Sequence, residues 1–170
     1  MTLKNIIHWI DIISEWTGHL TAWLILFMVV IIVYQASMVA LFSIGSVALQ
    51  ELQWHIFAVV FLVGSAYTLK HDEHVRVDII YKSHWLTDRQ RAWIDLFGGL
   101  FFLLPFCVLI IIASWPFVYN AFISAEGSPD PGGLPYRFLL KAAIPLGFLL
   151  LMLQGIANSL KNLVYLLEKK

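Results

Sequence analysis

The chain has 170 residues, of which 60% are hydrophobic and 13% are charged, and its mean hydropathy is +0.80. Because soluble domains carry about 25% charged residues, this composition indicates an integral membrane protein. The 11 basic and 11 acidic residues cancel, so there is no basic face that would suit nucleic acid. A single cysteine, Cys107, excludes an internal disulfide.

The N-terminal segment, residues 3–16, is expected to form an amphipathic helix. Its charged and ionisable side chains recur at helical spacing, at Lys4, His8, Asp11 and Glu15. Such a helix either lies in the membrane interface or leads into the first span. A cleavable signal peptide is the weaker interpretation, because the apolar run that follows is too long and acids lie among the first residues.

Long apolar runs predict four membrane spans, since about 20 apolar residues cross the hydrocarbon core as a helix. We expect them at about 19–41, 51–70, 92–115 and 138–160. The fold class is therefore all-α: a four-helix integral membrane protein forming one domain over residues 1–170. Ser43 to Ser46 is the expected turn between the first two spans.

Two prolines interrupt the third apolar run. Pro105 is expected to kink the helix, and Pro116 to end or strongly bend it. Further on, Glu126 to Arg137 is rich in glycine and proline and is expected to be a loop.

The charged segment from Lys70 to Arg91 follows the second span. A short interfacial helix is expected over residues 78–86, and Thr87 with Asp88 looks like the cap of the next helix. This segment, the N-terminus and the C-terminal tail hold nine basic residues, whereas Arg137 and Lys141 are the two on the other side. The positive-inside rule then places both termini in the cytoplasm and the 126–137 loop in the periplasm.

Candidate cofactor sites are weak. His19 and His55 would lie at opposite membrane faces and could not share one haem iron. A metal site formed by His71, His74 and the carboxylates near them is conceivable, but His-x-x-His alone is a weak signal. Within His74-Val-Arg76-Val-Asp78, an extended strand would place His74, Arg76 and Asp78 on one face, as a recognition surface would require.

Transport by this chain alone and catalysis are both disfavoured. Asp, Glu, Lys and Arg occur only at the span ends, whereas pathways for charged solutes need ionisable groups at membrane depth. The chain lacks the sequence motifs of a hydrolase nucleophile, a zinc protease and a phosphate-binding loop. We therefore expect no catalytic, cofactor-binding or metal-binding residue, and a chain that assists a larger partner.

Several short motifs together resemble the small membrane subunit of TRAP transporters, the tripartite ATP-independent periplasmic transporters. They are Gln50-Glu51-Leu-Gln-Trp54-His55, Gly64-Ser-Ala-Tyr-Thr-Leu-Lys70, His74-Val-Arg76-Val-Asp78, Gly132-Gly133-Leu-Pro-Tyr-Arg137 and Lys141-Ala-Ala-Ile-Pro145. The resemblance covers about 45–160. It implies a four-span subunit of the bacterial inner membrane that pairs with a large permease. A soluble periplasmic protein would deliver the substrate, usually a carboxylate, and a sodium gradient would drive uptake.

The residues expected to contact a partner lie at the ends of the spans. They are Glu51, Trp54, His55, His74, Arg76, Asp78, Gly132, Gly133, Arg137 and Lys141. Glu51 and Lys141 are expected near Arg137 and Glu126, where opposite charges would hold the helices together or present a docking surface. Tryptophans give apolar faces for lipid or a partner helix. A small four-helix membrane cytochrome and a free-standing membrane anchor remain the alternatives.

Overall fold

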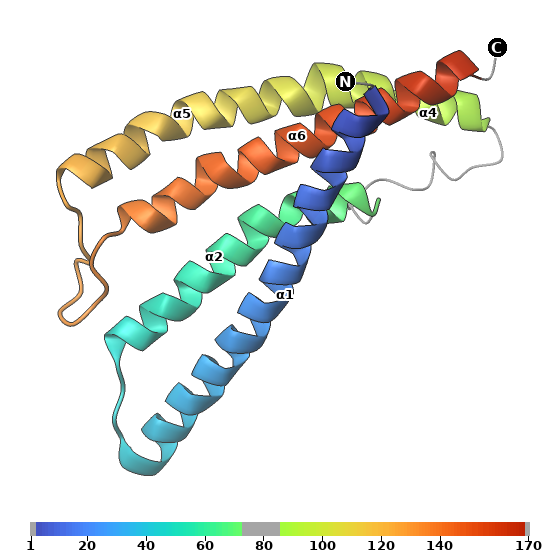
Figure 1. The fold of residues 1–170 in the computed structure, drawn as a ribbon. Coiled ribbons are helices and arrows are strands. Elements are labelled where there is room, and N and C mark those ends of the chain that lie inside the picture. Colours follow the sequence, from blue (N-terminus) through green and yellow to red (C-terminus); the bar gives the residue numbers. More distant parts are fainter. Residues whose placement is uncertain (1–2, 73–85, 169–170) are drawn as a thin grey trace.

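The computed structural model describes residues 3–72 and 86–168, and these residues are helical apart from turns and loops (Figure 1). The elements are α1 (Leu3–Phe42), α2 (Val47–Lys70), α4 (Asp88–Gly98), a π-helical segment η1 (Gly99–Leu103), α5 (Leu104–Ile123) and α6 (Phe138–Glu168). The expected interfacial helix over 78–86 lies almost entirely outside the described residues.

Four helical stretches are long and apolar enough to cross a membrane: α1, α2, the continuous stretch over residues 88–123, and α6. The all-helical, four-span fold class is therefore confirmed. The expected spans all fall on these helices, and the points at which the membrane surfaces cross them stay a prediction.

Helix α1 joins the amphipathic segment and the first span into one element of 40 residues. At about 1.5 Å per residue it is about 60 Å long, roughly twice the thickness of a hydrocarbon core. Of the two arrangements expected for residues 3–16, the structure shows the one that leads into the span. A side chain at Gly18 would place its Cβ 2.0 Å from Tyr67 Cδ2, so this glycine lets α2 approach.

The four long helices form two hairpins, α1 with α2 and α5 with α6, which meet where α2 lies beside α6 (Figure 1). Helix α1 also crosses α6 near both termini, so α6 contacts every other long helix. Helices α2 and α5 lie on different sides of α6, and within the described ranges they make no extended contact with one another. The arrangement is therefore more open than a closed four-helix bundle.

Small residues bring α2 and α6 together. A Cβ at Gly147 would lie 2.7 Å from the backbone oxygen of Leu62, and Ala66, Ala143 and Ala157 are buried. Membrane helices pack through small residues because lipid gives no hydrophobic drive for them to associate, so close van der Waals contact matters more.

The turn between α1 and α2 spans residues 43–46, as expected. Ser46 caps α2 by accepting a hydrogen bond from the Leu49 N–H at 3.4 Å. Across this hairpin, Gln53 Nε2 donates to Gln35 Oε1 at 2.6 Å, and Gln35 Nε2 donates to the Ser46 carbonyl at 3.3 Å. Two paired amides therefore close the end of the hairpin.

The two prolines of the third stretch behave differently from one another. Pro105 is the second residue of α5, and η1 ends just before this helix; the Leu104 N–H donates to the Gly99 carbonyl five residues back. A proline ring clashes with the carbonyl four residues earlier, and a wider π turn gives it room. Helix α5 continues through Pro116 to Ile123, so of the two outcomes expected there an end of the helix is wrong, while a strong bend stays a prediction. Membrane helices tolerate such a proline because neighbouring groups compensate the lost backbone hydrogen bond.

Candidate functional site

Most of the charged side chains, and the polar side chains that bond to them, lie near the two ends of the helices. At one end is the loop cluster, which we define as Glu51, Glu126, Ser128, Gly133, Arg137 and Lys141. At the other end is the terminal network, defined as Asp11, Ser14, Glu15, Lys70, His71, Gln154, Asn158 and Lys161. Between these ends the spans carry no Asp, Glu, Lys or Arg.

Glu51 is the centre of the loop cluster. It lies in the second turn of α2 and is only 5% exposed. Its carboxylate accepts a hydrogen bond from the Ser128 hydroxyl and another from the Leu134 N–H at 2.7 Å. Both donors belong to the loop between α5 and α6, so one buried carboxylate fastens that loop onto α2.

The loop itself folds back on its own backbone. The Arg137 N–H donates to the Glu126 carbonyl at 2.8 Å, and the Ser128 N–H donates to the Leu134 carbonyl at 3.0 Å. Its two adjacent glycines serve different needs. Gly132 has φ of +81°, a conformation that side chains disfavour. Gly133 leaves room for its neighbours, because a Cβ there would lie 2.4 Å from Ser128 Oγ.

Lys141 joins α6 to the loop and to α5. Its Nζ lies 2.5 Å from Glu126 Oε2 and 3.8 Å from the centroid of the Phe117 ring. The side chain is only 15% exposed, so Glu126 and the Phe117 ring replace much of the water around its charge. The structure thus brings Glu51, Lys141, Arg137 and Glu126 together, as their positions in the sequence predict.

The remaining partner-contact candidates behave in three ways. Trp54 is 62% exposed, so its side chain points outward from the packed helices. His55 Nδ1 lies 2.7 Å from the Glu51 carbonyl, one turn back on its own helix. His74, Arg76 and Asp78 lie outside the described residues, so their expected role stays a prediction.

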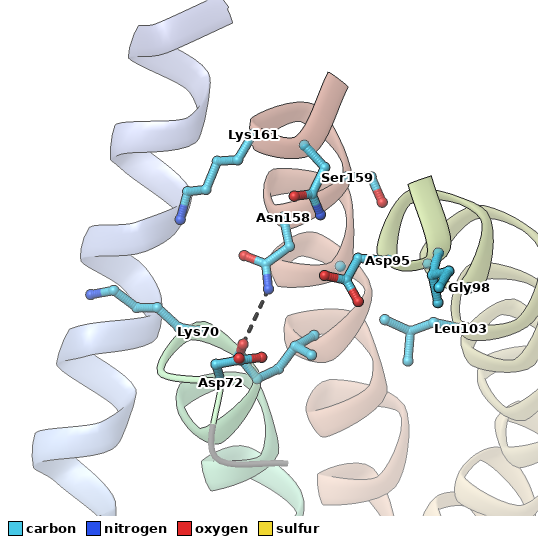
Figure 2. Close-up of a pocket in the computed structure, with 13 residues that line it drawn as sticks. Lys70, Asp72, Asp95, Gly98, Leu103, Asn158, Ser159 and Lys161 are labelled. Atoms are coloured by element: carbon cyan, nitrogen blue, oxygen red, sulfur yellow. Dashed lines mark hydrogen bonds between the residues drawn. The ribbon is translucent and has the colours of Figure 1, made fainter. Parts of the chain in front are cut away.

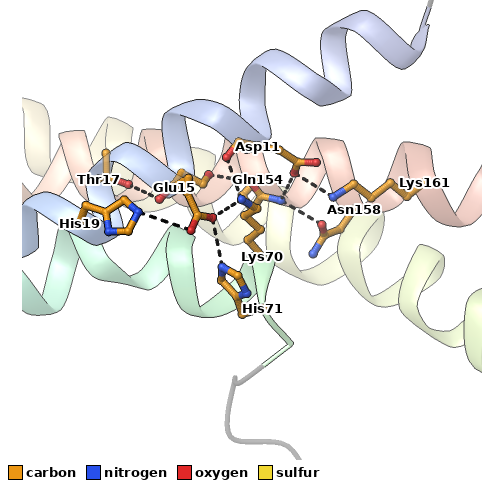
Figure 3. Close-up of polar contacts among 10 residues, drawn as sticks. Asp11, Glu15, Thr17, His19, Lys70, His71, Gln154, Asn158 and Lys161 are labelled. Carbon is orange, nitrogen blue, oxygen red and sulfur yellow. Dashed lines mark hydrogen bonds and ion pairs between the residues drawn. The ribbon is translucent and has the colours of Figure 1, made fainter. Parts of the chain in front are cut away.

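The terminal network joins α1, α2 and α6 (Figure 3). Lys70, the last residue of α2, forms an ion pair with Glu15 and donates to the Asp11 carbonyl at 3.1 Å. His71 Nε2 lies 3.2 Å from the same Glu15 carboxylate. Lys161 of α6 lies 2.8 Å from Asp11 Oδ1. Two acids of α1 therefore hold the ends of two other helices.

Gln154 is the buried centre of this network, with no exposed surface. Its Oε1 accepts from the Ser14 hydroxyl at 2.6 Å, and its Nε2 donates to Asp11 Oδ1 at 3.1 Å and to Asn158 Oδ1 at 3.0 Å. Asn158 Nδ2 in turn donates to the Leu69 carbonyl at 3.1 Å. Both polar atoms of the buried Gln154 amide, its oxygen and its nitrogen, thus have hydrogen-bond partners, as buried polar groups require.

Sequence reasoning missed this network. The signal was present in two helical repeats: Asp11 and Glu15 on α1, and Gln154, Asn158 and Lys161 on α6. The first repeat predicted an amphipathic helix but named no partner for its polar face, which in the structure meets α2 and α6. The second repeat contains uncharged amides that hydropathy reads as part of a span.

A cavity of about 580 Å³ lies beside the network, between the end of α2, the α4–η1 junction and α6 (Figure 2). Asp72, Asp95, Asn158 and Ser159 contribute polar lining, while Lys70 and Lys161 turn their amines toward α1. Among the residues that the structure describes, no three potential metal ligands form a cluster. Part of the conceivable site around His71 and His74 lies outside that range.

His19 of α1 lies near the Lys70 end of α2, whereas His55 lies near the Val47 end of α2. His19 Nε2 is 3.8 Å from Glu15 in the terminal network, whereas His55 follows Glu51 in the loop cluster. Two axial ligands must approach one iron from opposite sides at bonding distance, so these two histidines cannot share a haem.

The four long apolar helices, with polar clusters confined to their ends, define a multi-pass α-helical membrane protein. The chain matches the family described as tripartite ATP-independent periplasmic transporters, DctQ component, over residues 28–164, and it belongs to this family. No curated protein sequence matches it. Members of this family are transporter components of the inner membrane, and the family is not an enzyme family. The match begins at residue 28, earlier in the chain than the motifs near residue 45.

Proposed function

We propose that this chain is the small membrane subunit of a sodium-coupled TRAP transporter that takes up an organic acid. In this role it scaffolds the large permease and helps to dock the periplasmic substrate-binding protein. The observation that carries the proposal is the separation of its polar groups. They lie in two clusters at the helix ends, and the segments between them have no charged residue that could pass an anion across the membrane.

The outer surfaces of the helices favour a scaffold. Large apolar side chains such as Trp54, Phe102 and Trp115 are 62%, 78% and 63% exposed, and lipid or a partner can cover them. Because α2 and α5 meet only through α6, the open arrangement offers apolar faces on more than one helix. A large permease with many spans is a partner that could use such faces.

The loop cluster supports the docking role. The 124–137 loop is held by Glu51 and by its own backbone hydrogen bonds, while Asp130 and Tyr136 remain exposed on it. A loop fixed in this way presents a preformed surface, and preformed surfaces lose less entropy on binding. Gly132, Gly133 and Arg137 belong to this surface, with Lys141 supporting it from below.

The test is a reconstitution of the large permease and its binding protein into liposomes, with and without this chain. Sodium-driven uptake should require the chain, and the chain should co-purify with the permease. Full uptake without the chain contradicts the scaffold role, as does binding of an organic acid by the isolated chain. Replacing sodium by potassium in the same liposomes tests the coupling ion separately.

The orientation is part of the proposal, with both termini cytoplasmic and the 124–137 loop periplasmic. Cysteines replacing Gly127 and Glu168, each in a Cys107→Ser background, test it because both positions are exposed and they flank the two opposite ends of α6. In whole cells an impermeant maleimide should label position 127 and spare position 168. The reverse pattern contradicts the orientation.

A further inference from the structure

A groove of about 510 Å³ lies at the loop end of the protein, between α2 and α5 and over the first turns of α6. Ala58 and Leu62 form its α2 wall, Phe117 its α5 wall, and Leu140 and Ile144 its floor. The groove exists because α2 and α5 flank α6 without extended contact with each other in the described ranges. It is therefore a largely apolar depression between three of the candidate membrane-spanning helices.

The end of the groove nearest the loop carries positive charge. Lys141 and Arg137 both line it, together with Glu126. Lys141 is neutralised by Glu126 at 2.5 Å. The guanidinium of Arg137 forms no hydrogen bond or ion pair with any residue that the structure describes, although its charge acts on Glu51. A half-buried guanidinium with unused donors is a binding site for an anion.

We propose that this groove binds a membrane phospholipid, whose phosphate contacts Arg137 and one of whose acyl chains lies against Ala58, Leu62 and Ile144. The assignment rests on complementarity: the occupant must be apolar along the groove and anionic at the loop end. A guanidinium presents paired N–H donors that match the oxygens of a phosphate. Arg137 directly precedes α6, at the point where the sequence becomes apolar. A charged residue at the end of a membrane span is expected at the level of the lipid headgroups.

This site goes beyond the transport role and does not depend on it, since the groove is formed by this chain alone. A bound lipid would occupy the space that separates α2 from α5 and so complete the packing around α6. The proposal commits to a lipid as occupant. A free anion and a helix of the large permease are the competing occupants.

The test measures retention of phosphatidylglycerol by the purified full chain, using native mass spectrometry in a maltoside detergent, which has no phosphate. Arg137→Gln should weaken binding by about tenfold or more, because it removes charge-assisted hydrogen bonds to the phosphate. Ala58→Phe should weaken binding while keeping the charge, because it fills the groove. The matched control is Arg89→Gln, which removes an exposed positive charge from the first turn of α4, at the end of the helices away from the groove (Figure 1). It should bind as the unmodified chain does.

Three results overturn the proposal. The first is equal lipid retention by Arg137→Gln and the unmodified chain, with circular dichroism showing both folded. The second is displacement of the lipid by inorganic phosphate at similar concentration, which marks a free-anion site. The third is a photo-crosslinker at position 58 that joins the large permease in the assembled complex while no lipid is retained. If Ala58→Phe fails to fold, the comparison of Arg137→Gln with Arg89→Gln still decides the outcome.

Discussion

The loop cluster and the terminal network fasten the two ends of the same helices in different ways. In the loop cluster, Glu51 binds a hydroxyl and a backbone N–H of a neighbouring loop, so it fixes a connection rather than a helix. In the terminal network, Gln154 and Asp11 bind side chains from other helices, so they fix how the helices cross. One end of the molecule therefore fixes the conformation of a surface loop, and the other end fixes how the helices cross.

The largest effect is expected from Gln154→Leu in the terminal network. The change removes the buried acceptor of the Ser14 hydroxyl and the donor to Asn158 Oδ1, and among the described residues it leaves Asp11 Oδ1 with Lys161 alone, at a cost of about 1–3 kcal/mol. Thermal unfolding of the purified chain, followed by circular dichroism, measures it. Ser114→Ala is the matched control, because within residues 3–72 and 86–168 that buried hydroxyl bonds only to the Ile111 carbonyl of its own helix. An equal loss in both variants would show that the network does not hold the crossing.

Gly133→Ala should break the loop cluster and leave the helix crossing intact. A Cβ there would lie 2.4 Å from Ser128 Oγ and 2.8 Å from Glu51 Oε2, so the loop must shift, at about 1–3 kcal/mol. Gly127→Ala, on the same loop, has no atom within 4 Å of the added Cβ and should be nearly neutral. Limited proteolysis of the loop compares the two, and similar cleavage rates would contradict the prediction.

Glu51→Gln tests whether the loop cluster fixes the 124–137 loop without fixing the packing of the helices. The amide has only one oxygen to accept hydrogen bonds, so either Ser128 or Leu134 loses its partner. We expect the loop to open more often while the helices stay associated. A cysteine at Asp130 in a Cys107→Ser background should then react several-fold faster with a maleimide, with the thermal midpoint nearly unchanged. Unchanged reactivity of the cysteine would contradict this role of Glu51.

The smallest effects are expected from exposed charges around the terminal network. Lys4 lies 3.7 Å from Glu168, but the side chains are 78% and 66% exposed, so Lys4→Ala should cost at most about 0.5 kcal/mol. Lys161→Ala should cost more, up to about 1 kcal/mol, because its partner Asp11 is mostly covered. Thermal unfolding at low and high salt measures both, and a reversed order would show that the Asp11 contact adds nothing.

Apolar run length and turn composition predicted the four helices and the loop, because a bilayer allows few alternatives to a helix of about 20 residues. The contact region of Glu51 and Lys141 was also predictable, since charges excluded from the membrane must meet at the same surface. The polar partners of α1 were not. A polar stripe such as Asp11 and Glu15 looks the same whether it faces water or another helix, and only the partner helix decides. The π-helical segment before Pro105 was not predicted either, because its residues have the same apolar composition as the helix around it.

The partnership between α1 and α6 has a consequence for how the protein is made. Asp11 binds Gln154 and Lys161, which follow it by 143 and 150 residues, so its partners leave the ribosome among the last. Until then the Asp11 carboxylate of α1 lacks both of the side chains that contact it in the folded protein. Helices α1 and α6 can therefore take up their final crossing only when synthesis of the chain is nearly complete, and a chain in which α6 fails to insert leaves the Asp11 carboxylate without Gln154 and Lys161.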